Sequence, residues 1–206
     1  YKGILVTDSL EQYHLLDRKL PDVTNANCWA HARRAFADAV KAADKKDPQA
    51  VKSSVAYRAL QKIAEFYSID TGLKELPKEE RLKQRQEKIQ PMVEEFFAWV
   101  KQQVSEYAVP PKSKTGQGLN FIINQEKYLK VFLTDGDVPI DNSASERAIR
   151  TFCVGKKNWM FHNTARGAEA SALVYSIPET AKLNNLRPYY YFRHILTELP
   201  KLCDKK

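Results

Sequence analysis

One decapeptide combines residue types that could do phosphate chemistry. Positions 141–150 read DNSASERAIR, which places Glu146 on the first turn of an expected helix beside two arginines. A carboxylate can hold Mg²⁺, while Arg147 and Arg150 are three residues apart and share a helix face suited to phosphate contacts. Ser143 and Glu146 also have the spacing of a capping box, in which their side chains satisfy free backbone N–H groups. On the decapeptide alone, capping is the favoured interpretation.

A second carboxylate, Asp8, ends the apolar and β-branched run 3–7. This pattern predicts a buried strand that delivers an acid at its C-terminal edge, where sites are commonly built. Alone, Asp8 would be a turn residue with local hydrogen bonds. Together with Glu146 it predicts a divalent-metal site, because two-metal phosphoryl transfer gathers carboxylates on ions about 3.5 to 4 Å apart. A third acid is normally required.

Basic and aromatic residues extend the expected surface. Lys156 and Lys157 are followed by Asn158 and Trp159, whose ring could stack on an unpaired base. The alternatives are a solvated basic face and a core position for Trp159. Weaker candidates for the same nucleic-acid surface are His31, Arg33 and Arg34.

Composition predicts a soluble, basic protein with one or two compact domains. Of 206 residues 43% are apolar, and 33 Lys+Arg against 25 Asp+Glu give a formal charge of +8. Such a charge suits a polyanion, although a basic surface without a ligand is equally compatible with it. No apolar run approaches the roughly 20 residues of a membrane span, and the N-terminus lacks the basic start and apolar core of a signal peptide. We therefore expect an intracellular fragment, since the chain begins at Tyr1 within a strand.

The cysteines give no framework for disulfides or zinc. Their number, three, is odd, and their spacing shows no pairs, which fits a reducing cytoplasm. Cys28 and His31 form a C-x-x-H pair, but no second pair follows at the spacing of a zinc site. Both are therefore interpreted as packing residues.

Most of the remaining chain has helical periodicity. The stretch 77–90 is strongly charged and predicts a solvated helical face, and Pro178 should bend or break its helix. A second strand is expected at 23–28, a turn at 135–137 and a basic turn at 155–158. Helices are expected from 29 to before Asp47, and at 49–69, 77–90, beyond Pro91, 116–132, 143–153, 169–183 and 189–199.

At this point the chain resembles the IS66 (TnpC-type) family of insertion-sequence transposases. The resemblance covers nearly the whole chain, and the order and spacing of its motifs fit throughout. The matching stretches are GILVTDSLEQY at 3–13, CWAHARRAF at 28–36, DNSASERAIR at 141–150, GKKNWMF at 155–161 and ETAKLNNLRPYYYFRHILTELP at 179–200. Two positions depart from the family pattern: Ser143 replaces a usual Asn, and Pro178 interrupts a helix.

The resemblance implies an α/β, RNase H-like fold that is truncated at its N-terminus and mostly α by content. It matches Asp8 to the second Asp and Glu146 to the Glu of a DDE triad, while the first Asp and three strands would lie upstream of Tyr1. The 137 residues between the two acids would hold a helical insertion. The implied division is a partial core at 1–31, the insertion at 32–138, and the Glu-bearing and C-terminal helices at 139–206.

The implied activity is Mg²⁺- or Mn²⁺-dependent cleavage and transfer of DNA strands. Asp8 and Glu146 would be ligands in a two-metal site of the full-length enzyme, and this chain alone would be inactive. Implied partners are transposon ends, target DNA, further copies in a homo-oligomer and small accessory proteins of the element, with no membrane, in the bacterial cytoplasm at the nucleoid. Two alternatives stay open: a non-catalytic DNA-binding remnant, and a helical interaction protein in which Glu146 only caps.

Overall fold

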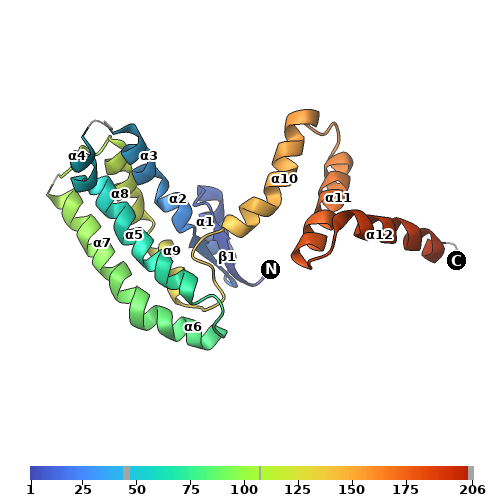
Figure 1. Cartoon of the computed structure of the whole chain (residues 1–206), viewed down its shortest axis with the longest axis horizontal. Helices are drawn as coiled ribbons and strands as arrows, with labels where there is room; N and C mark the ends of the chain where they lie inside the picture. Colours follow the sequence, from blue (N-terminus) through green and yellow to red (C-terminus); the bar gives the residue numbers. More distant parts are fainter. Residues whose placement is uncertain (44–46, 107, 204–206) are drawn as a thin grey trace. The chain divides into compact units, whose positions relative to one another are not determined.

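The structure is a computed structural model that describes residues 1–43, 47–106 and 108–203. The chain is mostly helical, as the sequence predicts, with a small parallel sheet. It divides into two compact units, Tyr1–Asn142 and Ser143–Lys206 (Figure 1). No helix in the described part of the chain combines the length and the apolar character that a membrane crossing requires.

The sheet of the first unit consists of β1 (Gly3–Thr7) and β2 (Val23–Asn27), and both predicted strands are confirmed. They run parallel, in a register that pairs Gly3 with Val23 and Thr7 with Asn27, and α1 (Glu11–Lys19) forms the crossover between them. The carboxyl ends of both strands therefore meet at one edge of the sheet. This edge receives the residue that follows each strand.

Helices make up the rest of the first unit. Asp47 caps the helix that follows the predicted interruption, because its side chain accepts a hydrogen bond from the Ala50 N–H. Ser54 divides the predicted helix 49–69, because its side chain accepts one from the Tyr57 N–H and caps a new helix. The helices are α2 (Trp29–Ala32), α3 (Arg34–Ala42), α4 (Pro48–Ser53), α5 (Val55–Gly72), α6 (Lys78–Gln84), the π-helical turn η1 (Arg85–Ile89), α7 (Gln90–Ser105), α8 (Lys114–Asn124), α9 (Glu126–Leu129) and the 3₁₀ turn η2 (Val131–Leu133).

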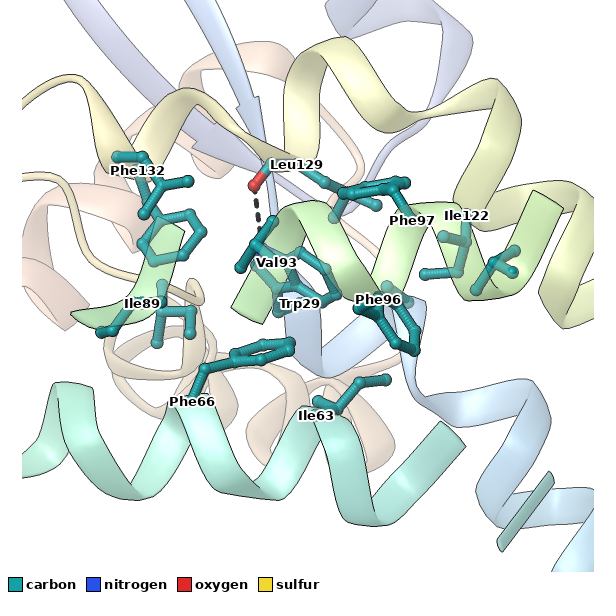
Figure 2. Close-up of a cluster of buried hydrophobic side chains, with 14 of the residues drawn as sticks. Trp29, Ile63, Phe66, Ile89, Val93, Phe96, Phe97, Ile122, Leu129 and Phe132 are labelled. Carbon is teal, nitrogen blue, oxygen red and sulfur yellow. Dashed lines mark hydrogen bonds between the residues drawn. The ribbon is translucent and has the colours of Figure 1, made fainter. Parts of the chain in front are cut away.

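Trp29, which opens α2 just after β2, lies at the centre of the core (Figure 2). Its side chain is fully buried, and its indole Nε1–H donates a 2.8 Å hydrogen bond to the Leu129 carbonyl. The rings of Phe66, Phe96 and Phe97 surround it, with centroids 4.8 to 6.1 Å away. Edge-to-face packing of this kind adds to the burial of apolar surface. The end of β2 is thereby fixed against α5 and α7.

The charged stretch 77–90 is not a solvated face throughout, because Arg85 is only 2% exposed. Its Nε donates to Asp70 at 2.7 Å. Its Nη1 donates to the carbonyls of Phe132, Asp135 and Val138 at 2.8 to 3.1 Å. The prediction was wrong here because charge periodicity alone does not reveal a partner distant in sequence. A buried guanidinium needs such compensation, so Arg85 holds the chain after η2 against α5.

Arg81 fastens the same region from the neighbouring turn. Its guanidinium donates to the carbonyl of Gly136 at 3.0 Å and also to the carbonyls of Leu73, Lys74 and Leu76. A Cβ at Gly136 would lie 2.1 Å from the Lys78 carbonyl oxygen, so only glycine fits this approach. The predicted turn at 135–137 is therefore docked on the start of α6.

The second unit consists of α10 (Ser143–Trp159), α11 (Ala165–Leu183) and α12 (Pro188–Cys203). The predicted basic turn at 155–158 is wrong, because α10 continues through it. Gly155 serves packing rather than a turn: a Cβ there would lie 2.3 Å from the Tyr175 hydroxyl oxygen. Pro178 does not break α11 either. The carbonyl of Val174, which Pro178 cannot bond, belongs to an exposed residue, so water can satisfy it.

Replacing Arg85 with Ala should lower the free energy of unfolding of the first unit by roughly 3 to 5 kcal/mol, because Asp70 and three carbonyls lose a buried partner. Urea denaturation followed by circular dichroism measures this loss. Lys83→Ala, which removes an exposed charge two residues earlier, should change the value by no more than about 0.5 kcal/mol. Equal effects of both substitutions would contradict the assigned role of Arg85.

Candidate active site

Asp8 lies at the carboxyl edge of the sheet, directly after β1, and is half-buried. Its Oδ1 accepts a 3.4 Å hydrogen bond from the Leu10 N–H, and it forms no salt bridge with the described part of the chain. Ser9 has a φ of 72°, which is uncommon for a residue with a side chain and costs about 1 to 2 kcal/mol. The chain thus turns sharply behind a carboxylate that keeps lone pairs for a ligand.

Three segments distant in the sequence meet at this edge. The Cys28 N–H donates to the Thr7 carbonyl at 2.9 Å, and the Trp29 N–H donates to the Ile140 carbonyl at 3.1 Å. The Asn142 N–H donates to the Cys28 Sγ at 3.4 Å. The residue before Asp8, the residue after β2 and the start of the DNSASERAIR motif are therefore linked by consecutive hydrogen bonds.

Asp141 is a residue of this edge to which the sequence analysis assigned no role. Its Oδ2 accepts a 3.1 Å hydrogen bond from the Tyr67 hydroxyl, which comes from α5. Burial and the Asp141 carboxylate both raise the pKa of Tyr67. Its position at the head of the motif was a signal, but the tyrosine partner is 74 residues away. Asp141 therefore fixes the motif to the bundle.

Cys28 is a packing residue, as the sequence predicts. Its side chain is fully buried, and burial together with the nearby Asp141 charge raises the pKa of its thiol. Such a thiol stays protonated and unreactive at neutral pH. Within the described residues, no group of three or more His, Cys, Asp or Glu side chains is placed to hold a metal ion.

The weaker basic candidates lie just beyond Cys28 and differ in direction. Arg33 and Arg34 are exposed and form no salt bridge with described residues, while His31 is half-buried. The charge of Arg33 lowers the pKa of Tyr67, so it lies on the side of the bundle that holds Asp141. Arg34 instead lines a groove beside α8, together with His31.

In the second unit, α10 presents three of its four basic residues on one face. Helical geometry advances about 100° per residue, which places Glu146, Arg147, Arg150 and Lys157 within an arc of about 100°. All four are exposed. Lys156 lies about 100° from Lys157 around the helix and leaves this face. The two lysines, which the sequence analysis assigned to one basic surface, therefore lie on different faces of α10.

The opposite face of α10 packs on α11. Phe152 contacts Tyr175, with ring centroids 5.3 Å apart, and Ala148 and Ile149 line a cavity of about 480 Å³ between the two helices. Trp159 belongs to this side, because its ring lies 5.1 Å from that of Phe152 and 4.3 Å from that of His162. Asn158 is exposed at the end of the helix.

Comparison with known proteins identifies the family. The model of the Transposase IS66 family matches residues 1–170, and the chain belongs to this family. The uncharacterized protein y4hP of Sinorhizobium fredii (strain NBRC 101917 / NGR234) is 31% identical over 97% of this chain and 37% of its own length. Protein y4qI of the same strain is 27% identical over 97% of this chain and 36% of its own length. The chain thus spans little more than a third of these relatives, and no solved structure matches it.

The first unit should lose stability in alkali. Cys28 and Tyr67, with ordinary pKa values of 9.0 and 10.0, both have raised pKa values in the folded state. A raised pKa stabilises the fold below the unfolded-state value, and this contribution is lost above it, by up to about 1.4 kcal/mol per pH unit for each group.

Urea denaturation at about pH 7, 9 and 11 measures this loss, and Tyr67→Phe should reduce the decline between about pH 9 and 11 by about 1.4 kcal/mol. Tyr13→Phe is the matched control, because the Tyr13 hydroxyl makes no hydrogen bond with described residues. A decline that is unchanged in Tyr67→Phe would contradict the assigned tyrosine–aspartate contact.

Proposed function

We propose that this chain supplies part of the active site of an insertion-sequence transposase that cleaves DNA strands and transfers them. The observation that carries the proposal is that hydrogen bonds through Cys28 and Trp29 link Thr7, the residue before Asp8, to the 140–142 segment at one sheet edge. Glu146 follows Asn142 by four residues, so the acid-bearing helix starts from the anchored segment. In this proposal the sheet belongs to an RNase H-like core of residues 1–31 and 139–206, with 32–138 as a helical insertion.

The chemistry of Asp8 and Glu146 suits Mg²⁺ or Mn²⁺, which prefer carboxylate oxygens. Asp8 supports this assignment because no salt bridge with described residues occupies it. When bound in a two-metal site, such ions activate the attacking oxygen and stabilise the leaving oxygen of a phosphodiester. Two acids do not complete such a site, and we propose that a further Asp comes from the longer protein. The isolated chain is then inactive.

In the proposed reaction the basic face of α10 holds the DNA backbone beside Glu146. Arg147, Arg150 and Lys157 each offer donors to phosphate oxygens, which position the duplex without reading its sequence. Lys156 and Asn158 are proposed as outer contacts. Trp159 would have to leave its ring partners to stack on a base, whereas His31, Arg33 and Arg34 can bind phosphates from the first unit.

The proposed partners follow from this reaction. They are the two transposon ends and target DNA, with further copies of the transposase bringing the ends together in a homo-oligomer. Small accessory proteins of the same element are further proposed partners. The proposed place of action is the nucleoid in the bacterial cytoplasm.

A second candidate function is DNA binding without catalysis. The exposed Arg147, Arg150 and Lys157 of α10 favour it, because contacts to phosphates do not require a metal. The two functions differ in their dependence on metal: binding by a non-catalytic remnant would not respond to Mg²⁺, whereas a catalytic site would.

Glu146→Gln and Asp8→Asn should each lower strand cleavage by the full-length protein about 10²-fold or more, because each removes a charged metal ligand. Cleavage of a labelled duplex that carries a transposon end, in Mg²⁺ and in Mn²⁺, measures the rate. Glu169→Gln, an exposed acid on α11, is the matched control and should leave the rate unchanged. Full activity of Glu146→Gln would sink the proposal.

The two neighbouring lysines of α10 provide a test of the basic face. Lys157→Ala should reduce the slope of log affinity against log salt concentration by about one, as expected for one lost phosphate contact, and Lys156→Ala should reduce it less. Fluorescence anisotropy with a labelled duplex measures both slopes. A larger effect of Lys156→Ala would show that DNA approaches α10 from the other side.

A further inference from the structure

A groove in the first unit lies between α3 and α8. The two helices pack side by side (Figure 1) although about 80 residues separate them in sequence. The groove has a volume of about 290 Å³. Its lining consists of His31, Ala32, Arg34, Ala35 and Asp38 from the α2–α3 segment, and Lys114, Gln117 and Phe121 from α8.

Small residues allow the helices to approach closely enough to form this groove. A Cβ at Gly118 would lie 2.8 Å from the ring of Phe36 and 3.2 Å from the Cβ of Ala35. Two residues earlier, a Cβ at Gly116 would lie 2.3 Å from the Pro110 carbonyl oxygen. The N-terminal turn of α8 is thereby held against both α3 and the preceding loop, which fixes Lys114 opposite Arg34.

The cations of the groove are available to a ligand. Arg34 and Lys114 are exposed, and neither forms a salt bridge with the described part of the chain. Asp38 also lines the groove, is exposed and is unpaired among described residues, so the arginine has not been neutralised by it. In the same unit Lys62, Lys101 and Lys130 are all paired with glutamates.

We infer that the α3–α8 groove binds the phosphate backbone of DNA, as a second contact surface in addition to the basic face of α10. Arg34 and Lys114 donate to phosphate oxygens from the two walls. Between them Gln117 offers its second amide N–H, because its Nε2 already donates one hydrogen bond to the Lys112 carbonyl at 3.0 Å. Lys112, exposed in the loop before α8, extends the surface along the strand. The inference rests on the proposed function, because it takes DNA as the ligand, and it gives the helical segment 32–138 a share in holding the substrate.

The test measures binding of the 206-residue chain to a labelled duplex of arbitrary sequence, without divalent metal, over a series of salt concentrations. The double substitution Arg34→Ala/Lys114→Ala should reduce the slope of log affinity against log salt by about two, since two phosphate contacts are lost. Lys83→Ala/Lys88→Ala removes the same charge from exposed positions on α6 and η1 and should reduce it less. Asp38→Asn should raise the affinity, because it removes a negative charge that faces the phosphates.

The outcomes separate this inference from the proposed function. Equal losses in the two double variants, or an unchanged affinity in Asp38→Asn, would overturn the groove while leaving α10 as the DNA surface. No salt-dependent binding by the unsubstituted chain would overturn both. A greater loss in Arg34→Ala/Lys114→Ala together with tighter binding by Asp38→Asn would establish the groove as a contact surface.

Discussion

The buried ion pair between Arg85 and Asp70 is the constraint on which the first unit depends. A guanidinium removed from water is tolerable only when its donors are satisfied, and here one carboxylate and three carbonyls satisfy them. If one of those carbonyls moved away, the buried guanidinium of Arg85 would lose a hydrogen-bond partner in an apolar environment. Residues 134–140 are therefore held in one arrangement, although they form neither a helix nor a strand.

Through this arrangement the helical bundle fixes the position of the 140–142 segment at the sheet edge. Once Val138 is held by Arg85, the next residues reach the Trp29 N–H through the Ile140 carbonyl and the Tyr67 hydroxyl through Asp141. Trp29 itself is locked by its ring partners and by Leu129. A site assembled from residues far apart in sequence needs supports of this kind, because a displacement of about 1 Å is enough to impair catalysis. The helical segment therefore fixes the sheet edge at which Asp8 lies.

The sequence predicted local features of this structure better than long-range ones. The strand before Asp8 was evident from five apolar or small residues, and the parallel partner at 23–27 was found despite its asparagines. Asn25 and Asn27 are buried, and their side chains are hydrogen-bonded; the Asn25 Oδ1, for example, accepts a hydrogen bond from the Thr7 hydroxyl. The role of Arg85 could not be predicted, since its partners lie 15 to 53 residues away. Gly155 was taken for a turn because the tyrosine that requires a glycine belongs to another helix.

In the candidate site, too, local positions could be predicted from the sequence and long-range contacts could not. The place of Asp8 at a strand end could be predicted because the strand pattern and the acid are adjacent in sequence, and the place of Glu146 on the first turn of a helix could be predicted from its motif. Asp141 received no role, because only folding brings Tyr67 to it. The directions of the Lys156 and Lys157 side chains likewise could not be predicted from their adjacent positions. Because α10 continues through both residues, Lys157 lies on the face of Glu146 and Lys156 does not.

Net charge alone does not locate a DNA surface in this chain. Residues 143–206 contain 11 Lys+Arg against 5 Asp+Glu, so they hold +6 of the formal +8, while the first 142 residues hold +2. The first unit still has many cations, but several of them form salt bridges with glutamates and aspartates, as Lys78 and Lys127 do. Screening confines the remaining attraction to about 10 Å, so a phosphate responds to unpaired neighbours rather than to the total. Exposed cations without a salt bridge to described residues, rather than the charge of each unit, are therefore the basis on which the face of α10 and the groove between α3 and α8 are proposed.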